Sequence, residues 1–170
     1  MEQARQAELD AVKLLTSQHR EMEGLLQQVA DSHGDDTTKN LFAQIADQLT
    51  VHLKAEEEIF YPAVHEACTE DDLLESLEEH LSLKRLLADL IELEPADKTF
   101  EPKFKVLKEQ TEHHHREEEE HLFPEVLKLL DAERRMALGK AILARQFELA
   151  KKGEPRGAVS NETISAAPLQ

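Results

Sequence analysis

Two histidine–glutamate pairs with the same spacing are the residues of this chain best suited to chemistry. In each pair the glutamate follows the histidine by four residues, and a proline follows the glutamate by six. The two copies stand 62 positions apart and read His52, Glu56, Pro62 and His114, Glu118, Pro124. On a helix, residues i and i+4 lie on one face about one turn apart, so the imidazole and the carboxylate point the same way. Each copy therefore predicts half of a metal-binding site.

A further histidine precedes each copy and extends the repeat. His19 and His80 are 61 positions apart, and apolar residues recur at the same offset, as Val12 and Leu73 do. The chain is therefore a duplicated helical hairpin. The four repeated histidines and the two glutamates fall on the apolar stripes of four predicted helices. Because buried polar groups are costly unless they are paired, this arrangement predicts cations in the core.

The donor types indicate which metal is bound. Cys68 is the only cysteine, which excludes a thiolate cluster and an internal disulfide. Imidazole and carboxylate donors without thiolate favour iron or manganese over a structural zinc ion. A carboxylate from each half can bridge two ions, as inward-facing glutamates do in other bundle-core dimetal proteins. The competing interpretation is a purely structural bundle with scattered histidines, which predicts no metal.

Three consecutive histidines leave the ligand of the second copy ambiguous by spacing alone. His113 and His115 also precede a glutamate by four residues, but only His114 keeps the six-residue step from its glutamate to the proline. His113 and His115 are therefore predicted at the surface, together with His33 and His65. The remaining glutamates of both copies are predicted to form a solvated face: Glu57, Glu58, Glu117, Glu119 and Glu120.

Two further residues lie near the predicted site. His121 falls near the inner face, but its repeat counterpart is Ile59, which favours a packing or supporting role over direct ligation. Glu23 follows His19 by four residues, yet its counterpart is Lys84, so Glu23 is not included among the predicted ligands.

Hydrophobic periodicity of about 3.6 residues predicts the helices that must position these side chains. The predicted ranges are 10–31, 38–67, 72–94, 102–130 and 131–152, with an N-cap for the third helix expected at Thr69 to Asp72. Four long helices with short loops predict an all-α fold, an up-down-up-down antiparallel four-helix bundle with an additional C-terminal helix. Residues 1–152 form this single domain, and the composition of residues 153–170 predicts a flexible tail. Pro62 and Pro124 lie inside helical patterns and predict a kink just past each glutamate.

Composition limits the classes of partner. A net charge of −16 over 170 residues disfavours nucleic acid and anionic membranes, because their phosphates would be repelled. No stretch approaches the roughly 18 apolar residues that a membrane span requires. The first residues lack the basic start and apolar run of a signal peptide. Together with the single cysteine, these features predict a cytoplasmic protein without nucleic-acid or membrane partners.

The order of the repeated residues resembles the hemerythrin family, specifically its bacterial HHE cation-binding branch: His19, His52 with Glu56, His80, and His114 with Glu118. The resemblance covers about residues 10–130. It implies a four-helix bundle that holds two non-haem iron ions in an oxo- or hydroxo-bridged centre. It further implies that His19 and His52 serve one iron, that His80 and His114 serve the other, and that Glu56 and Glu118 bridge them.

The sequence departs from the oxygen-carrying members of that family at one ligand. Those proteins have a second histidine one turn from the third-helix ligand, which gives one iron three imidazoles. Here the residues four before and four after His80 are Ser76 and Lys84. The site is therefore expected to be symmetric and one nitrogen short, which disfavours reversible oxygen carriage.

Two classes of function remain after this departure. One is a binding module whose di-iron centre binds or senses dioxygen, nitric oxide or iron itself. The other is an enzyme that decomposes peroxide or oxidises iron at the same site. No effector domain accompanies the bundle, so a sensor would signal through a separate protein partner.

Overall fold

The structure is a computed structural model that describes residues 9–66, 68 and 70–170, and over these residues it is helical without strands. The all-helical bundle predicted from the sequence is confirmed. The α-helices are α2 (Ala11–Asp31), α3 (Asp35–Ala55), α4 (Tyr61–Val64), α5 (Glu70–Ile91), α6 (Phe100–Glu117), α7 (Phe123–Leu129) and α8 (Ala132–Lys151). Three further segments have other helical hydrogen bonding: the π-helical η1 (Glu56–Phe60) and η2 (Glu118–Leu122), and the 3-10 helix η3 (Pro155–Glu162).

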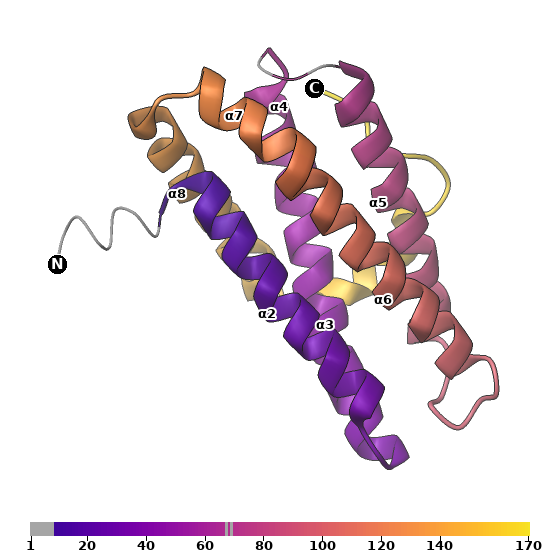
Figure 1. Ribbon diagram of the computed structural model, residues 1–170. Coiled ribbons are helices and arrows are strands. Elements are labelled where there is room, and N and C mark those ends of the chain that lie inside the picture. Colours follow the sequence, from indigo (N-terminus) through magenta and orange to yellow (C-terminus); the bar gives the residue numbers. More distant parts are fainter. Residues whose placement is uncertain (1–8, 67, 69) are drawn as a thin grey trace, which may run out of the picture.

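Four long helices surround the core. In Figure 1 each of α2, α3, α5 and α6 runs opposite to the one before it. Helix α2 packs against α3 and α6, and α5 packs against the same two helices, which closes the ring. Helix α8 lies across α2 and α3 on the outside. Among the residues described, no helix is both long enough and apolar enough to cross a lipid bilayer.

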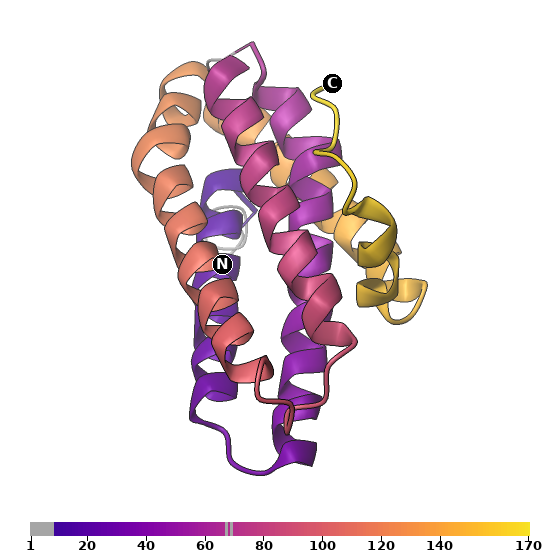
Figure 2. The ribbon, with the colours of Figure 1, turned by 90° about the vertical axis from the view of Figure 1, so that its right-hand side faces the viewer.

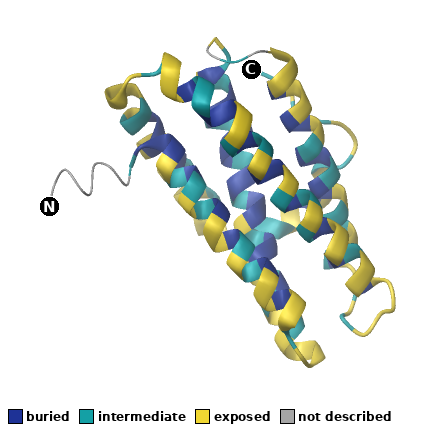
Figure 3. Ribbon diagram, viewed as in Figure 1, coloured by how far each residue is buried: buried dark blue, intermediate teal, exposed yellow. Residues whose placement is uncertain are grey.

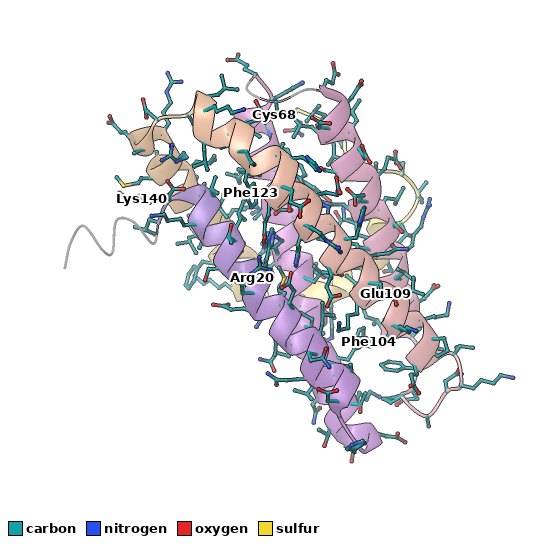
Figure 4. All side chains as sticks on the ribbon, viewed as in Figure 1. Arg20, Cys68, Phe104, Glu109, Phe123 and Lys140 are labelled. Carbon is teal, nitrogen blue, oxygen red and sulfur yellow. The ribbon has the colours of Figure 1, made fainter. Side chains whose placement is uncertain are left out.

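The interior divides into two apolar clusters with a polar layer between them. One cluster surrounds Phe104, near the loops that join α2 to α3 and α5 to α6, and the other surrounds Phe123, near α7 and α8. Figure 4 labels both phenylalanines and so marks the two levels of the bundle. Figure 3 shows the buried residues as stripes along the inward faces of the helices. The predicted metal ligands lie in the layer between these clusters: His19, His52, Glu56, His80, His114 and Glu118.

Side chains fix where the helices begin. The carboxylate of Asp10 accepts a hydrogen bond from the Val12 N–H at 3.0 Å and so caps α2. The same carboxylate accepts a 2.7 Å hydrogen bond from Arg135, which ties α8 to the start of α2. Gly34 precedes α3 with a φ of 90°, which favours glycine over residues with a Cβ. Ala67, the predicted end of the second helix, and Thr69, the first residue of the predicted N-cap, lie outside the described residues.

Both prolines produce a π-helical turn in place of a simple kink. Pro62 and Pro124 have no N–H to donate to the carbonyl four residues back. The preceding residues instead donate five residues back: Tyr61 N–H to the Glu56 carbonyl, and Phe123 N–H to the Glu118 carbonyl. A π turn inserts one extra residue, so the side chain five positions after each glutamate rotates onto the inner face.

The residues after Gly153 pack on the bundle, where composition predicts a flexible tail. Helix η3 lies along α3 and α5, as the yellow segment in Figure 2 shows. Val159 is buried in the cluster around Phe104. Arg156 donates to Asp47 at 2.7 Å, and Lys54 donates to Glu162 at 2.6 Å. These long-range contacts hold a segment whose local composition has low helix propensity.

Substitution of alanine for glycine is expected to change the free energy of unfolding in opposite directions at two helical positions, Gly139 and Gly24. A Cβ on Gly139 of α8 would stand 1.7 Å from the Leu9 carbonyl oxygen, whereas a Cβ on Gly24 of α2 would meet nothing within 4 Å. We expect Gly139→Ala to lower the free energy of unfolding by about 1–3 kcal/mol, because backbone must move. Gly24→Ala should raise it by about 0.5–1 kcal/mol, because alanine is the better helix former. Urea denaturation of both variants tests this, and equal shifts would contradict the close crossing of α8 over residue 9.

Candidate metal centre

The six residues predicted as ligands come together in the polar layer, each no more than 2 % exposed. Glu56 places Oε1 2.8 Å from Nε2 of His52 and Oε2 3.1 Å from Nε2 of His80. Glu118 Oε1 lies 3.4 Å from Nε2 of His19 and 3.3 Å from Nε2 of His114. Each carboxylate therefore contacts one histidine from each half of the duplication, which is the position a bridging ligand requires.

The residues present fit a pair of cations. Their ligand atoms form two groups within 4.8 Å, one of His19, His52, Glu56 and Glu118, the other of Glu56, His80 and His114. Donors on one octahedral ion with bonds of about 2.1 Å lie about 3 Å apart, as several of these atoms do. Buried polar atoms without a hydrogen-bond partner are costly, and here they cluster at one place. Among the described residues, no neighbour lies in hydrogen-bonding geometry for six such atoms, although His52 Nε2 and Glu56 Oε1 are 2.8 Å apart. The six are Nε2 of His19, His52 and His115, Nδ1 of His114, and Oε1 of Glu56 and Glu118.

The two buried carboxylates of the layer, Glu56 and Glu118, repel each other, which also favours the binding of cations. Burial and the neighbouring Glu56 carboxylate hold the pKa of Glu118 well above its ordinary value. Burial opposes ionisation of Glu56 too, but the imidazoles of His52, His114 and His80 hold the pKa of Glu56 well below its ordinary value. Without a cation only one of the two facing carboxylates is therefore readily ionised. A bound cation would remove that repulsion and favour both carboxylates in the charged form.

A second set of carboxylates orients the histidines of the first helix in each half. His19 Nδ1–H donates to Glu119 at 2.8 Å, and His80 Nδ1–H donates to Glu57 at 3.0 Å. Glu57 and Glu119 are repeat counterparts, and each directly follows a predicted bridging glutamate. The expectation of a solvated face is wrong for Glu57, which is buried, and Glu119 is only partly exposed. The sequence feature that could have indicated this role is the repeated Glu-Glu pair, Glu56-Glu57 and Glu118-Glu119.

The residue before His19 orients His52 through a hydrogen bond, and the residue before His80 lies near His114 without forming one. His52 Nδ1–H donates to the Gln18 side-chain oxygen at 2.9 Å, and His114 Nδ1 lies 3.5 Å from Glu79. Gln18 and Glu79 are again repeat counterparts, 61 positions apart. Gln146 of α8 donates to the same Gln18 oxygen at 2.9 Å, so α8 supports the centre from outside. Outer contacts of this kind fix the orientation of metal-binding imidazoles, with Nε2 facing inward.

His115 is buried, and the prediction that it lies at the surface is wrong. It is 1 % exposed, its ring stacks on His19 with centroids 3.8 Å apart, and its Nδ1–H donates to Glu23 at 3.2 Å. Burial lowers the pKa of His115 to about 4, against the opposing effect of the Glu23 carboxylate. Adjacent residues on a helix differ in direction by about 100°. His114 thus faces α5 and His115 faces α2, a pairing that only the tertiary structure specifies.

The Tyr61 side chain also reaches the layer of predicted ligands, on the side of His80. Its hydroxyl lies 3.0 Å from Nε2 of His80 and 3.2 Å from Oε2 of Glu118. Burial and the nearby carboxylates hold the pKa of Tyr61 well above its ordinary value, so the phenol keeps its proton in the absence of a cation. The π turn rotates Tyr61 inward, which the helical periodicity of the sequence did not indicate. Its counterpart Phe123 stacks near His19, so the two halves differ here.

The remaining candidates lie outside the inner layer. His121 is exposed, and its nearest acidic neighbour is Glu117 at 3.7 Å, so the structure does not place it in a supporting role. His33 and His113 are exposed as predicted. Lys84, which stands where a second third-helix histidine would be, is buried and donates to Glu57 at 2.9 Å.

Comparisons with known proteins show the family and the fold of the chain. The family model described as hemerythrin HHE cation binding domain matches residues 10–126. A crystal structure of a hemerythrin HHE cation binding domain-containing protein from Mycobacterium kansasii superposes with a TM-score of 0.76 at 24 % identity, over 89 % of this chain and 98 % of that one. A curated protein from Nostoc sp., named DNA nickase, is 30 % identical over 115 residues, and the chain spans about a third (33 %) of its length. On the family match, the chain belongs to the hemerythrin HHE cation-binding domain family.

Proposed function

We propose that the chain is a non-haem di-iron protein that binds or senses dioxygen, related small molecules such as nitric oxide, or iron itself. The observation that carries this proposal is the convergence of unpartnered, buried nitrogen and oxygen atoms on one layer of the bundle. Neutral imidazoles and carboxylates without thiolate are the donors that suit iron in such bundles.

Each half of the duplication would contribute to both ions. His19 and His52 would hold one iron, His80 and His114 the other, and the carboxylates of Glu56 and Glu118 would bridge them. When bound, an iron pair supplies redox chemistry and positions for a small ligand. The chain itself orients His19 and His80 through outer carboxylates and His52 through the Gln18 amide, and the two apolar clusters exclude water on either side of the layer.

A cleft leads from the surface toward this layer. It has a volume of about 390 Å³, lies among α2, α3, α8 and the start of η3, and is lined by Gln18, His52 and Gln146 among others. The hydrogen-bonded pair Gln18 and His52 lines this cleft, and His52 is one of the predicted ligands. The cleft therefore brings solvent close to the His52 side of the layer.

The second candidate function is an enzyme that decomposes peroxide or oxidises iron at the same site. The observation that favours it is the protonated Tyr61 hydroxyl beside His80 and Glu118, where it can donate a hydrogen bond to a ligand. Measuring peroxide consumption by wild-type protein and by Tyr61→Phe separates this function from simple binding. Unchanged consumption in the variant would remove Tyr61 from any such activity.

We do not extend the nicking activity in the name of the Nostoc protein to this chain. The match covers a third of that protein, and a net charge of −16 repels the phosphates of DNA. We propose a cytoplasmic location, in keeping with the single cysteine, and a protein partner if the centre acts as a sensor.

The wild-type protein should bind about two irons per chain, because the six inward donors form two groups that share Glu56. Metal analysis of protein reconstituted anaerobically with ferrous iron measures this, and the optical spectrum after oxidation tests for a bridged ferric pair. One zinc per chain, or no iron after reconstitution, would contradict the proposed function.

A further inference from the structure

We propose that His115, oriented by Glu23, is a fifth imidazole ligand, which serves the cation held by His19 and His52. The inference rests on the proposed di-iron function and specifies its coordination. It makes the centre asymmetric, with three imidazoles on one side and two imidazoles beside the Tyr61 hydroxyl on the other.

The geometry of His115 matches that of the other histidines in the layer. Its outer nitrogen is bonded to a carboxylate, as those of His19 and His80 are. Its inner Nε2 is buried and has no hydrogen-bond partner. The ligand nitrogens of His19, His52 and His115 all lie within 4.8 Å of one another. One cation can therefore reach all three nitrogens.

A packing role alone does not account for this side chain. An imidazole nitrogen left unpaired in the core costs about 1–3 kcal/mol, and a leucine at the same place would carry no such cost. The repeat contains that alternative, because the counterpart of His115 is Leu53, which packs in the cluster around Phe104. The counterpart of Glu23 is Lys84, which cannot accept a hydrogen bond from an imidazole. The histidine of the second half and its acceptor in the first half therefore form a pair, and both members are replaced in the counterpart pair, Leu53 and Lys84.

The asymmetry distinguishes the two cations by the number of imidazoles that each would have. The cation near His19 would be enclosed by three imidazoles and by the ring of Phe123. The cation near His80 would have fewer protein nitrogens and the Tyr61 hydroxyl within reach. We therefore assign the exogenous small ligand to the His80 and His114 side. This arrangement supplies, from α6, the nitrogen that the third helix lacks.

The test is His115→Leu, which copies the first half of the repeat, with His113→Leu as the matched control. His113 is the exposed neighbour on the same helix. Anaerobic competition between the protein and a ferrous chelator gives the two iron-binding constants, and urea denaturation gives the stability of the metal-free protein. We expect His115→Leu to weaken one constant by about tenfold or more, to spare the other, and to leave metal-free stability equal or higher. His113→Leu should change neither constant.

A second variant keeps the inference testable if His115→Leu does not fold. Glu23→Gln retains the shape and an acceptor oxygen, and should weaken the same constant by about tenfold. Two unchanged constants in His115→Leu, with two irons bound by the wild type, would overturn this inference alone. A wild type that binds fewer than two irons would instead contradict the proposed function.

Discussion

Glu56→Gln is expected to reduce bound iron from about two per chain to less than one, the largest loss of metal among single substitutions in the layer. Glu56 contacts His52 through one oxygen and His80 through the other, so it is the residue through which both ions would be joined. An amide is neutral and offers a single acceptor oxygen, so it cannot bridge two cations as a carboxylate does. Metal analysis after anaerobic reconstitution and gel filtration measures the loss.

Glu58→Gln is the matched control for this substitution. Glu58 lies in the same π turn, but its side chain is partly exposed and contacts Arg145 of α8. We expect it to retain full iron content. Circular dichroism of metal-free Glu56→Gln should show an intact bundle, because the variant removes a buried charge. Equal iron content in both glutamine variants would show that Glu56 is not a ligand.

Glu57→Leu is expected to lower the free energy of unfolding of the metal-free protein by about 3–5 kcal/mol. Glu57 forms a buried ion pair with Lys84, at 2.7 Å from Oε1 and 2.9 Å from Oε2. With the carboxylate removed, the closest remaining acidic contact of Lys84 is Glu162 at 3.5 Å. An ammonium buried without a close counter-charge is costly, so the penalty comes mainly from the lysine that remains.

The double variant Glu57→Leu with Lys84→Met separates this cause from the loss of the His80 contact. Removing both charges should restore more than half of the lost stability, because a well-packed apolar pair often equals a buried ion pair. Urea denaturation of both variants and of Lys84→Met gives the coupling between the two positions. If the double variant is as unstable as Glu57→Leu, the contact between Glu57 and His80 is the larger contribution.

The packed C-terminal segment is coupled to the same ion pair. Glu162 in η3 accepts hydrogen bonds from Lys54 at 2.6 Å and from Lys84 at 3.5 Å. Lys84 in turn contacts Glu57, and Glu57 accepts from His80. A continuous chain of polar contacts therefore joins residues beyond Gly153 to a predicted metal ligand.

The local spacing of residues was enough to predict the helices and the six inner ligands. Helical periodicity and the i, i+4 relation depend only on the geometry of one helix, so they can be recognised in a sequence. Because the motif is duplicated, the spacing in the first copy identified His114 among three consecutive histidines. The structure brings the six residues together in one buried layer, and their role as ligands stays a prediction for metal analysis to test.

Other features depend on contacts between helices and were decided by the tertiary structure. His115 is buried because α2 brings His19 and Glu23 to that side of α6, although its own spacing matches that of exposed neighbours. Tyr61 faces the centre because the missing N–H of Pro62 shifts the hydrogen bonds by one residue. Residues 155–162 are held by Asp47, Lys54 and an apolar pocket for Val159, none of which is near in sequence. The residue pattern of one segment predicts which face of its helix is buried. Contacts with other helices determine which additional side chains are buried beside that face.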